Sequence, residues 1–226
     1  APGRTEVCGN HTDHNNGKVL AASINLDAIA IAAKRDDMKI NEKSEGHGLN
    51  EVDISTLSPD EAEYGRSSSM IKGVAAGLKE KGYEIGGFDA CTTSDVMGGS
   101  GLSSSAAFEV LIATVINHLY NDGKIDAVTV AKAAQFSENV YFGKPSGLLD
   151  QTASSVGTFV TIDFKDTANP VIKKVDFDFA KSGYSLCIVD THGNHSDLTD
   201  DYAAVRGEME AVAKAMGKNV LREGGY

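Results

Sequence analysis

A run of glycine and serine passes directly into an apolar helix in the middle of this chain. Residues 98–105 read GGSGLSSS, and apolar residues then recur at helical spacing at Phe108, Leu111, Ile112, Val115, Ile116 and Leu119. A flexible linker would stay polar on both sides, whereas this periodicity predicts one buried helix face. The run therefore lies at the start of a helix, where unpaired backbone N–H groups and the helix dipole favour an anion such as phosphate.

This run differs from two familiar nucleotide-binding loops. No Gly-Lys-Ser/Thr sequence closes it as in a Walker loop, and Gly99-x-Gly101-x-x-Ser104 lacks the third glycine of a dinucleotide fingerprint. Taken alone, the segment is also compatible with a tight turn capped by a serine. Both interpretations place the run immediately before a buried helix.

Two polar segments lie on either side of this run in the sequence. Residues 1–17, APGRTEVCGNHTDHNNG, crowd hydrogen-bonding side chains beside glycines more densely than a solvated loop needs. Residues 143–157, GKPSGLLDQTASSVG, set Asp150 directly after two leucines, where its carboxylate would be half desolvated. Each segment alone is a weak indication of a site.

Composition excludes several classes of partner. The chain has 226 residues and a formal net charge of −11 without a Lys/Arg cluster, so it would repel nucleic acid and anionic membrane surfaces. Its three cysteines are widely spaced, which argues against a disulfide framework, and no apolar stretch approaches the roughly 20 residues that span a bilayer. We expect a cytoplasmic monomer with small-molecule partners. The pairs His11-x-x-His14 and His192-x-x-His195 lack the further ligands of a zinc site.

The apolar patterns predict an α+β fold. Residues 19–40 are interpreted as a strand pair, although their alanine content also permits a helix. Helices are expected at 67–81, 105–119, 126–141 and 199–216, the last with an apolar stripe at Tyr202, Val205, Met209, Val212 and Met216. Further strands are expected at 88–94, 157–164 and 184–190. Because strands and helices do not alternate regularly, the order favours α+β layers over a Rossmann fold.

Together, and in this order, the three polar segments resemble landmarks of the galactokinase branch of the GHMP small-molecule kinases. Residues 1–17 are similar to the signature G-R-x-N-x-x-G-E-H-T-D-Y-N-x-G, the serine-rich run to G-L-S-S-S-A, and Gly147-Leu-Leu-Asp-Gln to G-I-M-D-Q. Residues 195–217 also resemble the corresponding helix of that branch. The resemblance implies the GHMP kinase N-terminal domain, a ribosomal-protein-like β-α-β fold with a mixed sheet packed against helices.

The same resemblance implies a domain organisation. Residues 1–226 would form the N-terminal domain portion, without the first strand-forming residues and without the C-terminal domain that carries a glycine-rich third motif. Because that motif closes the ATP site in the family, we expect residues 1–226 to be inactive alone.

The activity that the resemblance implies is ATP-dependent phosphorylation of D-galactose at the anomeric C1 hydroxyl, with ATP and Mg²⁺ required. Asp150 matches the position that orients and deprotonates the hydroxyl, and Arg4 the position that stabilises the transferring phosphoryl group. Implied sugar contacts are Asn10, His11, Asp13, Gly147, Asp150 and Tyr202. Implied ATP contacts are Gly98, Gly99, Ser100, Gly101, Leu102, Ser103, Ser104 and Ser105. Implied metal ligands are Ser105 and Glu138.

Several alternatives stay open at this level. Asn10 stands where the family signature usually has Glu, which leaves room for a related sugar such as N-acetylgalactosamine or arabinose, or for a non-catalytic galactose and ATP sensor. Asp150 could be a structural cap, Tyr202 a core residue, and Glu138 a solvated helix carboxylate. Residues 63–74 lack the aromatics that many galactokinases place near adenine, so the adenine contacts are unassigned. A guanidinium at Arg4 is expected to lower the pKa of a neighbouring Asp150.

Overall fold

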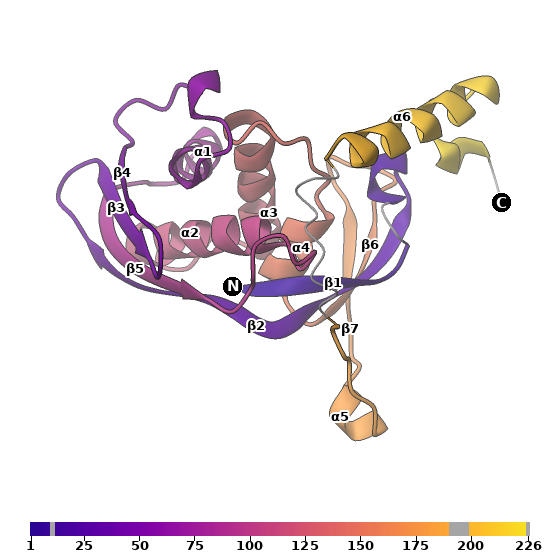
Figure 1. Ribbon diagram of the computed structural model, residues 1–226, viewed down its shortest axis with the longest axis horizontal. Helices are drawn as coiled ribbons and strands as arrows, with labels where there is room; N and C mark the ends of the chain where they lie inside the picture. Colours follow the sequence, from indigo (N-terminus) through magenta and orange to yellow (C-terminus); the bar gives the residue numbers. More distant parts are fainter. Residues whose placement is uncertain (10–11, 190–198, 225–226) are drawn as a thin grey trace.

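A mixed sheet covered on one face by helices forms the body of the protein (Figure 1). The computed structural model describes residues 1–9, 12–189 and 199–224. Within these residues, seven strands form one sheet in the order β4-β3-β5-β2-β6-β7, and β1 pairs with β2 beside this path. β3 and β5 are parallel, and the other strand pairs are antiparallel. The predicted α+β class is confirmed.

The strands are β1 (Pro2–Cys8), β2 (Lys18–Lys34), β3 (Lys39–Ser44), β4 (Leu49–Asp53), β5 (Phe88–Ser94), β6 (Phe159–Asp163) and β7 (Val171–Val175). The helices are α1 (Ser67–Glu80), α2 (Ser104–Tyr120), α3 (Ala127–Phe136), α4 (Leu149–Val156), α5 (Phe179–Ser182) and α6 (Thr199–Ala215). Short turns are η1 (Thr12–Asn15), η2 (Glu61–Glu63), the π-helical η3 (Ser137–Tyr141) and η5 (Leu221–Gly224). No helix in the described ranges combines the length and apolar character that crossing a bilayer requires.

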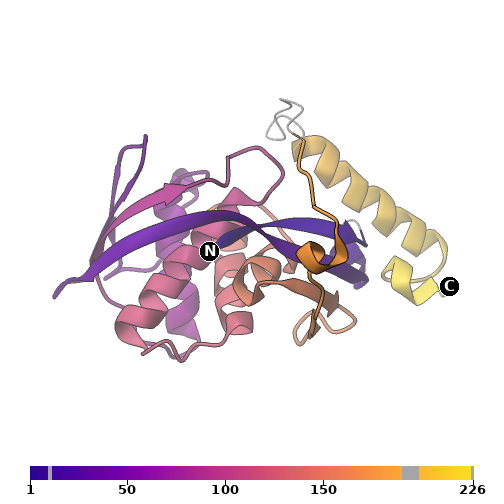
Figure 2. The same cartoon turned by 90° about the horizontal axis from the view of Figure 1, so that it is seen from below.

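The long strand β2 runs across the whole sheet (Figure 2). Its first part pairs with β1 and β6, and its second part pairs with β5. The prediction of a strand pair over 19–40 is therefore wrong. The alternation of buried and exposed residues continues to Lys34 without a turn, and the chain turns only at residues 35–38 before β3 begins.

The main core lies between the sheet and helices α1, α2 and α3. Apolar residues one or two helical turns apart face inward and are fully buried at Ile71, Val74 and Leu78 in α1 and at Ile112 and Ile116 in α2. Burying each of the larger side chains stabilises the fold by about 1.5–3 kcal/mol. The apolar residues whose spacing predicted these helices thus form the helix faces that pack against the sheet.

Other element predictions divide into confirmed and wrong ones. The expected helices are present, although the segment at 126–141 changes from α3 to π-helical geometry after Phe136. The strands expected at 88–94 and 157–164 are β5 and β6. The strand expected at 184–190 is wrong for residues 184–189, which are exposed and have no strand pairing, and Asp190 lies outside the described residues.

Helix α6 lies beyond the end of the sheet, beside η1 (Figures 1 and 2). Its predicted apolar stripe is about half exposed, at 46% for Val205 and 53% for both Val212 and Met216. The amide of Asn15 in η1 contacts the Met209 sulfur at 2.8 Å. Among the described side chains of this helix, Met209 contacts Asn15 and Ala213 is fully buried.

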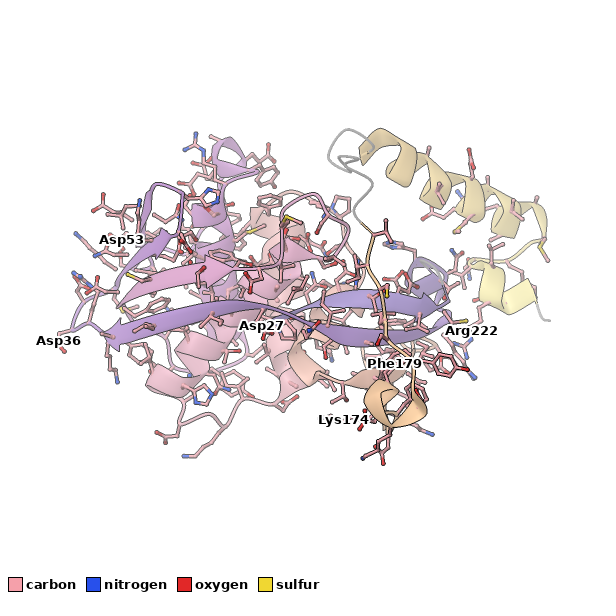
Figure 3. All side chains as sticks on the ribbon, turned by 60° about the horizontal axis from the view of Figure 1, so that its bottom comes forward. Asp27, Asp36, Asp53, Lys174, Phe179 and Arg222 are labelled. Atoms are coloured by element: carbon pink, nitrogen blue, oxygen red, sulfur yellow. The ribbon has the colours of Figure 1, made fainter. Side chains whose placement is uncertain are left out.

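Arg222 in η5 attaches this C-terminal segment to the sheet (Figure 3). Its guanidinium donates to both carboxylate oxygens of Asp163 at the end of β6 and, at 2.6 Å, to the carbonyl of Asn16. The hydrogen bond from Arg222 lowers the pKa of Asp163 to about 2. Because this pKa lies below its unfolded value of about 3.9, the pair stabilises the fold above that pH. The contribution is lost as pH falls toward about 2.

We expect Arg222→Met to loosen the C-terminal segment. The variant loses charge-assisted hydrogen bonds that contribute about 1 kcal/mol at this partly exposed site. The equilibrium constant for local opening of the C-terminal segment therefore rises roughly fivefold. Hydrogen exchange of residues 199–224 measures this opening. Arg35→Met is the matched control, because Arg35 also pairs with aspartates, Asp37 and Asp89, but just beyond the C-terminal end of β2. Equal exchange in both variants would show that Arg222 does not hold the segment.

Candidate active site

The glycine- and serine-rich run forms the loop between β5 and α2. Gly99 and Gly101 have φ of +73° and +76°, which a residue with a Cβ rarely adopts. Ser103 also has a left-handed backbone, with φ of +61°, although it is not glycine. A left-handed serine costs about 1–3 kcal/mol and is typical of functional sites.

Ser103 stands at the N-cap of α2 but does not cap the helix with its side chain. Its hydroxyl instead donates to Asp150 Oδ2 at 2.7 Å. The serine-capped turn, which was the structural alternative for this run, is therefore wrong at Ser103. The first-turn N–H groups of the 17-residue helix α2 therefore receive no hydrogen bond from the Ser103 side chain.

Arg4 in β1 joins this loop to helix α4. Its Nε donates to Asp150 Oδ1 at 2.7 Å, its Nη1 donates to the Gly101 carbonyl at 2.7 Å, and its backbone N–H donates to the Leu102 carbonyl at 3.0 Å. The Arg4 side chain is 12% exposed and that of Asp150 is 31% exposed. One guanidinium thus fixes the position of a carboxylate that is still reachable from solvent.

Burial and ion pairing act on the Asp150 carboxyl in opposite directions. Burial raises its pKa, while the charge and hydrogen bond of Arg4 and the hydrogen bond from Ser103 lower it, and the net result lies below the usual value. This direction agrees with the expectation from the sequence. Asp150 is therefore ionised at neutral pH and can accept a further hydrogen bond or a proton.

Asp13 and Gly147, two of the predicted sugar contacts, lie against each other. Asp13 in η1 is 9% exposed, and its Oδ1 accepts a hydrogen bond from the His14 backbone N–H at 3.0 Å. A Cβ at position 147 would stand 1.8 Å from Asp13 Oδ2, so only glycine fits there. Asn10 and His11 lie outside the described residues. Tyr202 belongs to α6, and its side chain is likewise outside the description.

Glu138 in η3 is buried, with 2% exposure. Its Oε1 accepts from the Ser105 hydroxyl at 3.0 Å and from the Lys144 ammonium at 3.1 Å, and its Oε2 accepts from the Gln151 amide at 2.5 Å. The alternative of a solvated helix carboxylate is therefore wrong. The two predicted metal ligands, Ser105 and Glu138, are adjacent.

The donor set at Ser105 and Glu138 fits a magnesium ion. Hydroxyl and carboxylate oxygens are the hard ligands that Mg²⁺ prefers, and it usually keeps several waters and binds phosphate oxygens besides one or two protein carboxylates. Across the residues described by the structure, no group of three or more His, Cys, Asp and Glu side chains forms a metal cage. A site with few protein ligands and room for phosphate matches this arrangement.

Residues 147–151 contact the predicted sugar-binding, phosphoryl-transfer and metal-binding residues. Gly147 lies against Asp13, Asp150 pairs with Arg4 and Ser103, and Gln151 binds Glu138. Gly147, just before α4, and Asp150 and Gln151 in its first turn therefore carry the contacts to the predicted sugar, phosphoryl and metal positions.

Sequence reasoning assigned no role to three residues of this site. Lys144 and Gln151 bind Glu138, and Glu109 lies fully buried in α2. Burial and the nearby Glu138 raise the pKa of Glu109 well above its usual value. A lone acidic residue within an apolar helical stripe is the signal that could have identified Glu109. Gln151 stands next to Asp150 in the quoted motif, and Lys144 has no comparable signal.

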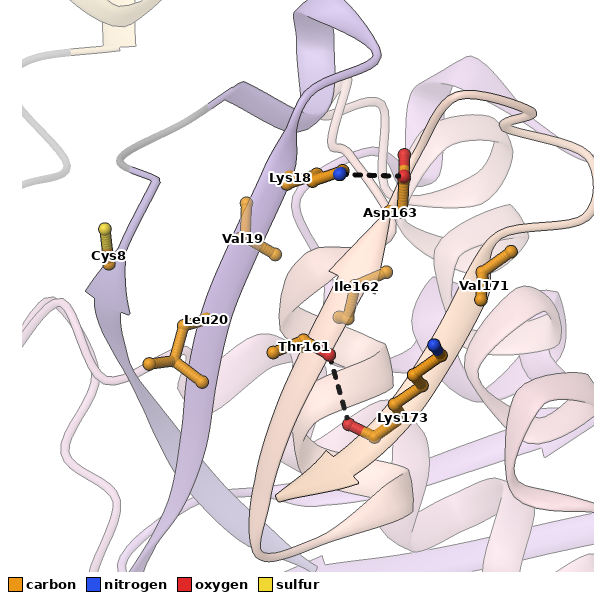
Figure 4. Close-up of a pocket in the computed structure, with 9 residues that line it drawn as sticks. All are labelled: Cys8, Lys18, Val19, Leu20, Thr161, Ile162, Asp163, Val171 and Lys173. Atoms are coloured by element: carbon orange, nitrogen blue, oxygen red, sulfur yellow. Dashed lines mark hydrogen bonds and ion pairs between the residues drawn. The ribbon is translucent and has the colours of Figure 1, made fainter.

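A hollow of about 420 Å³ lies elsewhere, along β2, β6 and β7 (Figure 4). Its lining includes the Cys8 side chain of β1 and the Lys18–Asp163 ion pair at 3.7 Å. None of the predicted site residues contributes to it. The hollow is therefore separate from the cluster around Asp150.

Two family models match this chain. GHMP kinases N terminal domain matches residues 69–158, which contain the loop, Glu138 and Asp150. The galactokinase galactose-binding signature matches residues 1–34, which contain Arg4 and Asp13. The two matches together include every predicted site residue except Tyr202.

Galactokinases and other kinases are similar to most or all of this chain. A galactokinase of Streptomyces coelicolor is 35% identical over 228 residues, covering 100% of this chain and 58% of the relative. The crystal structure of Lactococcus lactis galactokinase complexed with galactose superposes with a TM-score of 0.76 at 27% identity, covering 96% of this chain and 56% of that one. Methanococcus jannaschii mevalonate kinase, at 14% identity and a TM-score of 0.63, covers 80% of this chain and 56% of its own and shares the fold.

This chain spans little more than half the length of the relatives that it matches. The matched segments are those that carry the loop, the Arg4–Asp150 pair and the Asp13–Gly147 contact. The chain therefore contains a GHMP kinase N-terminal domain over residues 69–158 and the galactokinase galactose-binding signature over residues 1–34.

Proposed function

We propose that the whole protein, meaning this chain with any segments that continue it, phosphorylates D-galactose at the anomeric C1 hydroxyl. ATP is the phosphoryl donor, and the products are galactose 1-phosphate and ADP. The observation that carries this proposal is the Arg4–Asp150–Ser103 cluster, which joins the loop at 98–105 to the Asp13–Gly147 contact. Galactokinase relatives at 31–35% identity support the choice of sugar.

The sugar is bound on the Asp13 side of the cluster. The Asp13 carboxylate, which occupies the space where a Cβ of residue 147 would lie, accepts hydrogen bonds from sugar hydroxyls, and the backbone of Gly147 contacts the ring. Asn10, His11 and Tyr202 complete the set of proposed sugar contacts. In this placement the anomeric hydroxyl lies next to Asp150, three residues after Gly147.

The triphosphate is bound by the loop residues Gly98, Gly99, Ser100, Gly101, Leu102, Ser103, Ser104 and Ser105. Backbone N–H groups at the start of α2 and the helix dipole stabilise its negative charge. Ser105 and Glu138 hold Mg²⁺, which when bound neutralises charge on the phosphate oxygens. The proposed sites for sugar and ATP thus meet at Asp150.

Asp150 and Arg4 act on the reacting atoms. The C1 oxygen forms a bond to the γ-phosphorus of ATP, the bond from that phosphorus to the β–γ bridging oxygen breaks, and ADP leaves with the electron pair. Asp150 accepts the hydroxyl proton, and Arg4 stabilises the negative charge of the transferring group. Because Arg4 lowers the pKa of Asp150, the carboxylate is a weak base. A loose transition state suits such a base, since the proton leaves late.

Galactose-dependent ADP release tests the proposal. We expect the whole protein to release ADP from Mg-ATP when D-galactose is added, and to respond less to N-acetylgalactosamine and arabinose in a coupled assay. Binding of galactose by calorimetry without ADP release would favour a sensor, and release with another sugar only would correct the substrate. We also propose that residues 1–226 alone are inactive, so ADP release by this chain alone would contradict that part.

A further inference from the structure

Lys144 is a cation of the candidate active site with no role in the proposed chemistry. Its ammonium lies 3.1 Å from Glu138 Oε1, the same oxygen that accepts from Ser105. The Lys144 backbone N–H also donates to the backbone carbonyl of Glu138 at 3.0 Å. This bond holds the Lys144 backbone next to η3, the turn that carries Glu138. The carboxylate is buried, whereas the Lys144 side chain is 54% exposed.

We propose that Lys144 is a displaceable counter-ion: it pairs with Glu138 until a divalent cation arrives, and its ammonium then binds the triphosphate of ATP. This inference rests on the proposed function, because it assumes that a nucleoside triphosphate and a metal meet at Ser105 and Glu138.

The first step of the argument is competition for one oxygen. Glu138 Oε2 is occupied by the Gln151 amide at 2.5 Å, so a metal ion bound with Ser105 must approach Oε1, where the ammonium lies. A divalent cation and an ammonium on the same oxygen repel each other. Glu138 is buried and held by Gln151, whereas Lys144 has a flexible stem with its charged end partly in water. Lys144 is therefore the group that moves.

The second step concerns where the released charge goes. Arg4 is paired with Asp150 and the Gly101 carbonyl, so in the proposed chemistry its charge serves the transferring phosphoryl group next to Asp150. Lys144 lies within electrostatic reach of Asp150 as well as Glu138, since its charge contributes to lowering the pKa of Asp150. A triphosphate bound at the start of α2 presents several negative oxygens next to Ser105. These oxygens are the strongest available partner for an ammonium expelled from Glu138.

The consequence is a coupling between metal and nucleotide. When a metal ion binds alone, it displaces the Lys144 ammonium from Glu138, and the ammonium finds no new negatively charged partner. The lost ion pair therefore weakens binding of the metal. When the triphosphate is present, the displaced ammonium gains phosphate contacts. Lys144 thus makes the site bind the metal–nucleotide pair in preference to the free metal.

Replacing Lys144 with methionine tests this coupling in the whole protein. We expect Lys144→Met to bind Mn²⁺ alone about fivefold more tightly, by electron paramagnetic resonance, because the competing charge is gone. We expect the same variant to bind the Mg²⁺ complex of a non-hydrolysable ATP analogue about fivefold more weakly, by calorimetry. Lys144→Arg keeps the positive charge, so we expect its affinities for Mn²⁺ alone and for the Mg²⁺–analogue complex to stay close to those of the wild type.

Lys124→Met is the matched control, because Lys124 also pairs with a carboxylate, Asp122 at 2.9 Å, on an exposed turn away from the site. It should change neither affinity. Lys144→Met with unchanged affinities, or with weaker Mn²⁺ binding, would overturn the inference even if the wild type binds the analogue. Failure of the wild type to bind the analogue at all would overturn the proposed function together with this inference.

Discussion

Asp150→Asn is expected to reduce the turnover number of the whole protein about 10³-fold. Asparagine is nearly isosteric and can still accept from Arg4 or Ser103, but it has no charge and cannot take the hydroxyl proton. Galactose-dependent ADP release measures the loss. Calorimetry with galactose should show binding within a few-fold of the wild type, because the change removes proton acceptance and not the Asp13–Gly147 contact.

The melting temperature of Asp150→Asn distinguishes a loss of chemistry from misfolding. Arg4 loses its charged partner, so we expect the melting temperature to fall by about 2–4 °C, which corresponds to roughly 1 kcal/mol in a domain of this size. Asp89→Asn is the control, since Asp89 in β5 is also paired with an arginine, Arg35, just beyond the end of β2. Its turnover should equal that of the wild type. Unchanged turnover in Asp150→Asn would remove Asp150 from the chemistry.

Gly147→Ala is expected to weaken galactose binding about 100-fold. The new Cβ would lie 1.8 Å from Asp13 Oδ2 and 2.7 Å from Asp13 Cγ, far inside any real contact distance. Asp13 is buried and bound to the His14 N–H, so it cannot move aside freely. Either the carboxylate rotates away or the backbone before α4 shifts, and both outcomes remove hydrogen bonds to the sugar. Calorimetric titration of galactose gives the affinity.

Gly48→Ala is the matched control, because position 48 is open and a Cβ there meets no atom within 4 Å. This variant should bind galactose like the wild type. The ATP analogue should bind Gly147→Ala normally, since the loop at 98–105 keeps its contacts with Arg4. Retained galactose affinity in Gly147→Ala would show that the sugar is bound away from the Asp13–Gly147 contact.

Local patterns predicted the helices of this fold better than its sheet. The spacing of apolar residues determines which helix face is buried, so α1 and α2 agree with their predicted ranges. Strand alternation does not reveal where a strand ends or which partner it has. For this reason β2 was divided in two by the interpretation of 19–40, and residues 184–189 were assigned a strand although no neighbouring strand pairs with them.

The candidate site shows the same limit at the level of side chains. Arg4, Asp150, Ser105 and Glu138 could be selected by their likeness to a family, but their mutual contacts depend on how distant segments pack. The bond from Ser103 to Asp150 joins residues that the sequence assigned to different roles. The bonds from Lys144 and Gln151 to Glu138 depend on the π-helical turn η3, which no local pattern indicated.

The long strand β2 also constrains when the site can form during synthesis. β2 receives one neighbour from residues 88–94 and another from residues 159–163, and the Arg4–Asp150 bond spans 146 positions of the chain. Contacts between such distant residues form slowly, because a long loop must close before they stabilise the fold. A nascent chain that has emerged only as far as α2 has the loop at 98–105 but neither Asp150 nor β6. The Arg4–Asp150 pair can therefore form only after the chain has been synthesised through α4, well over half of its length.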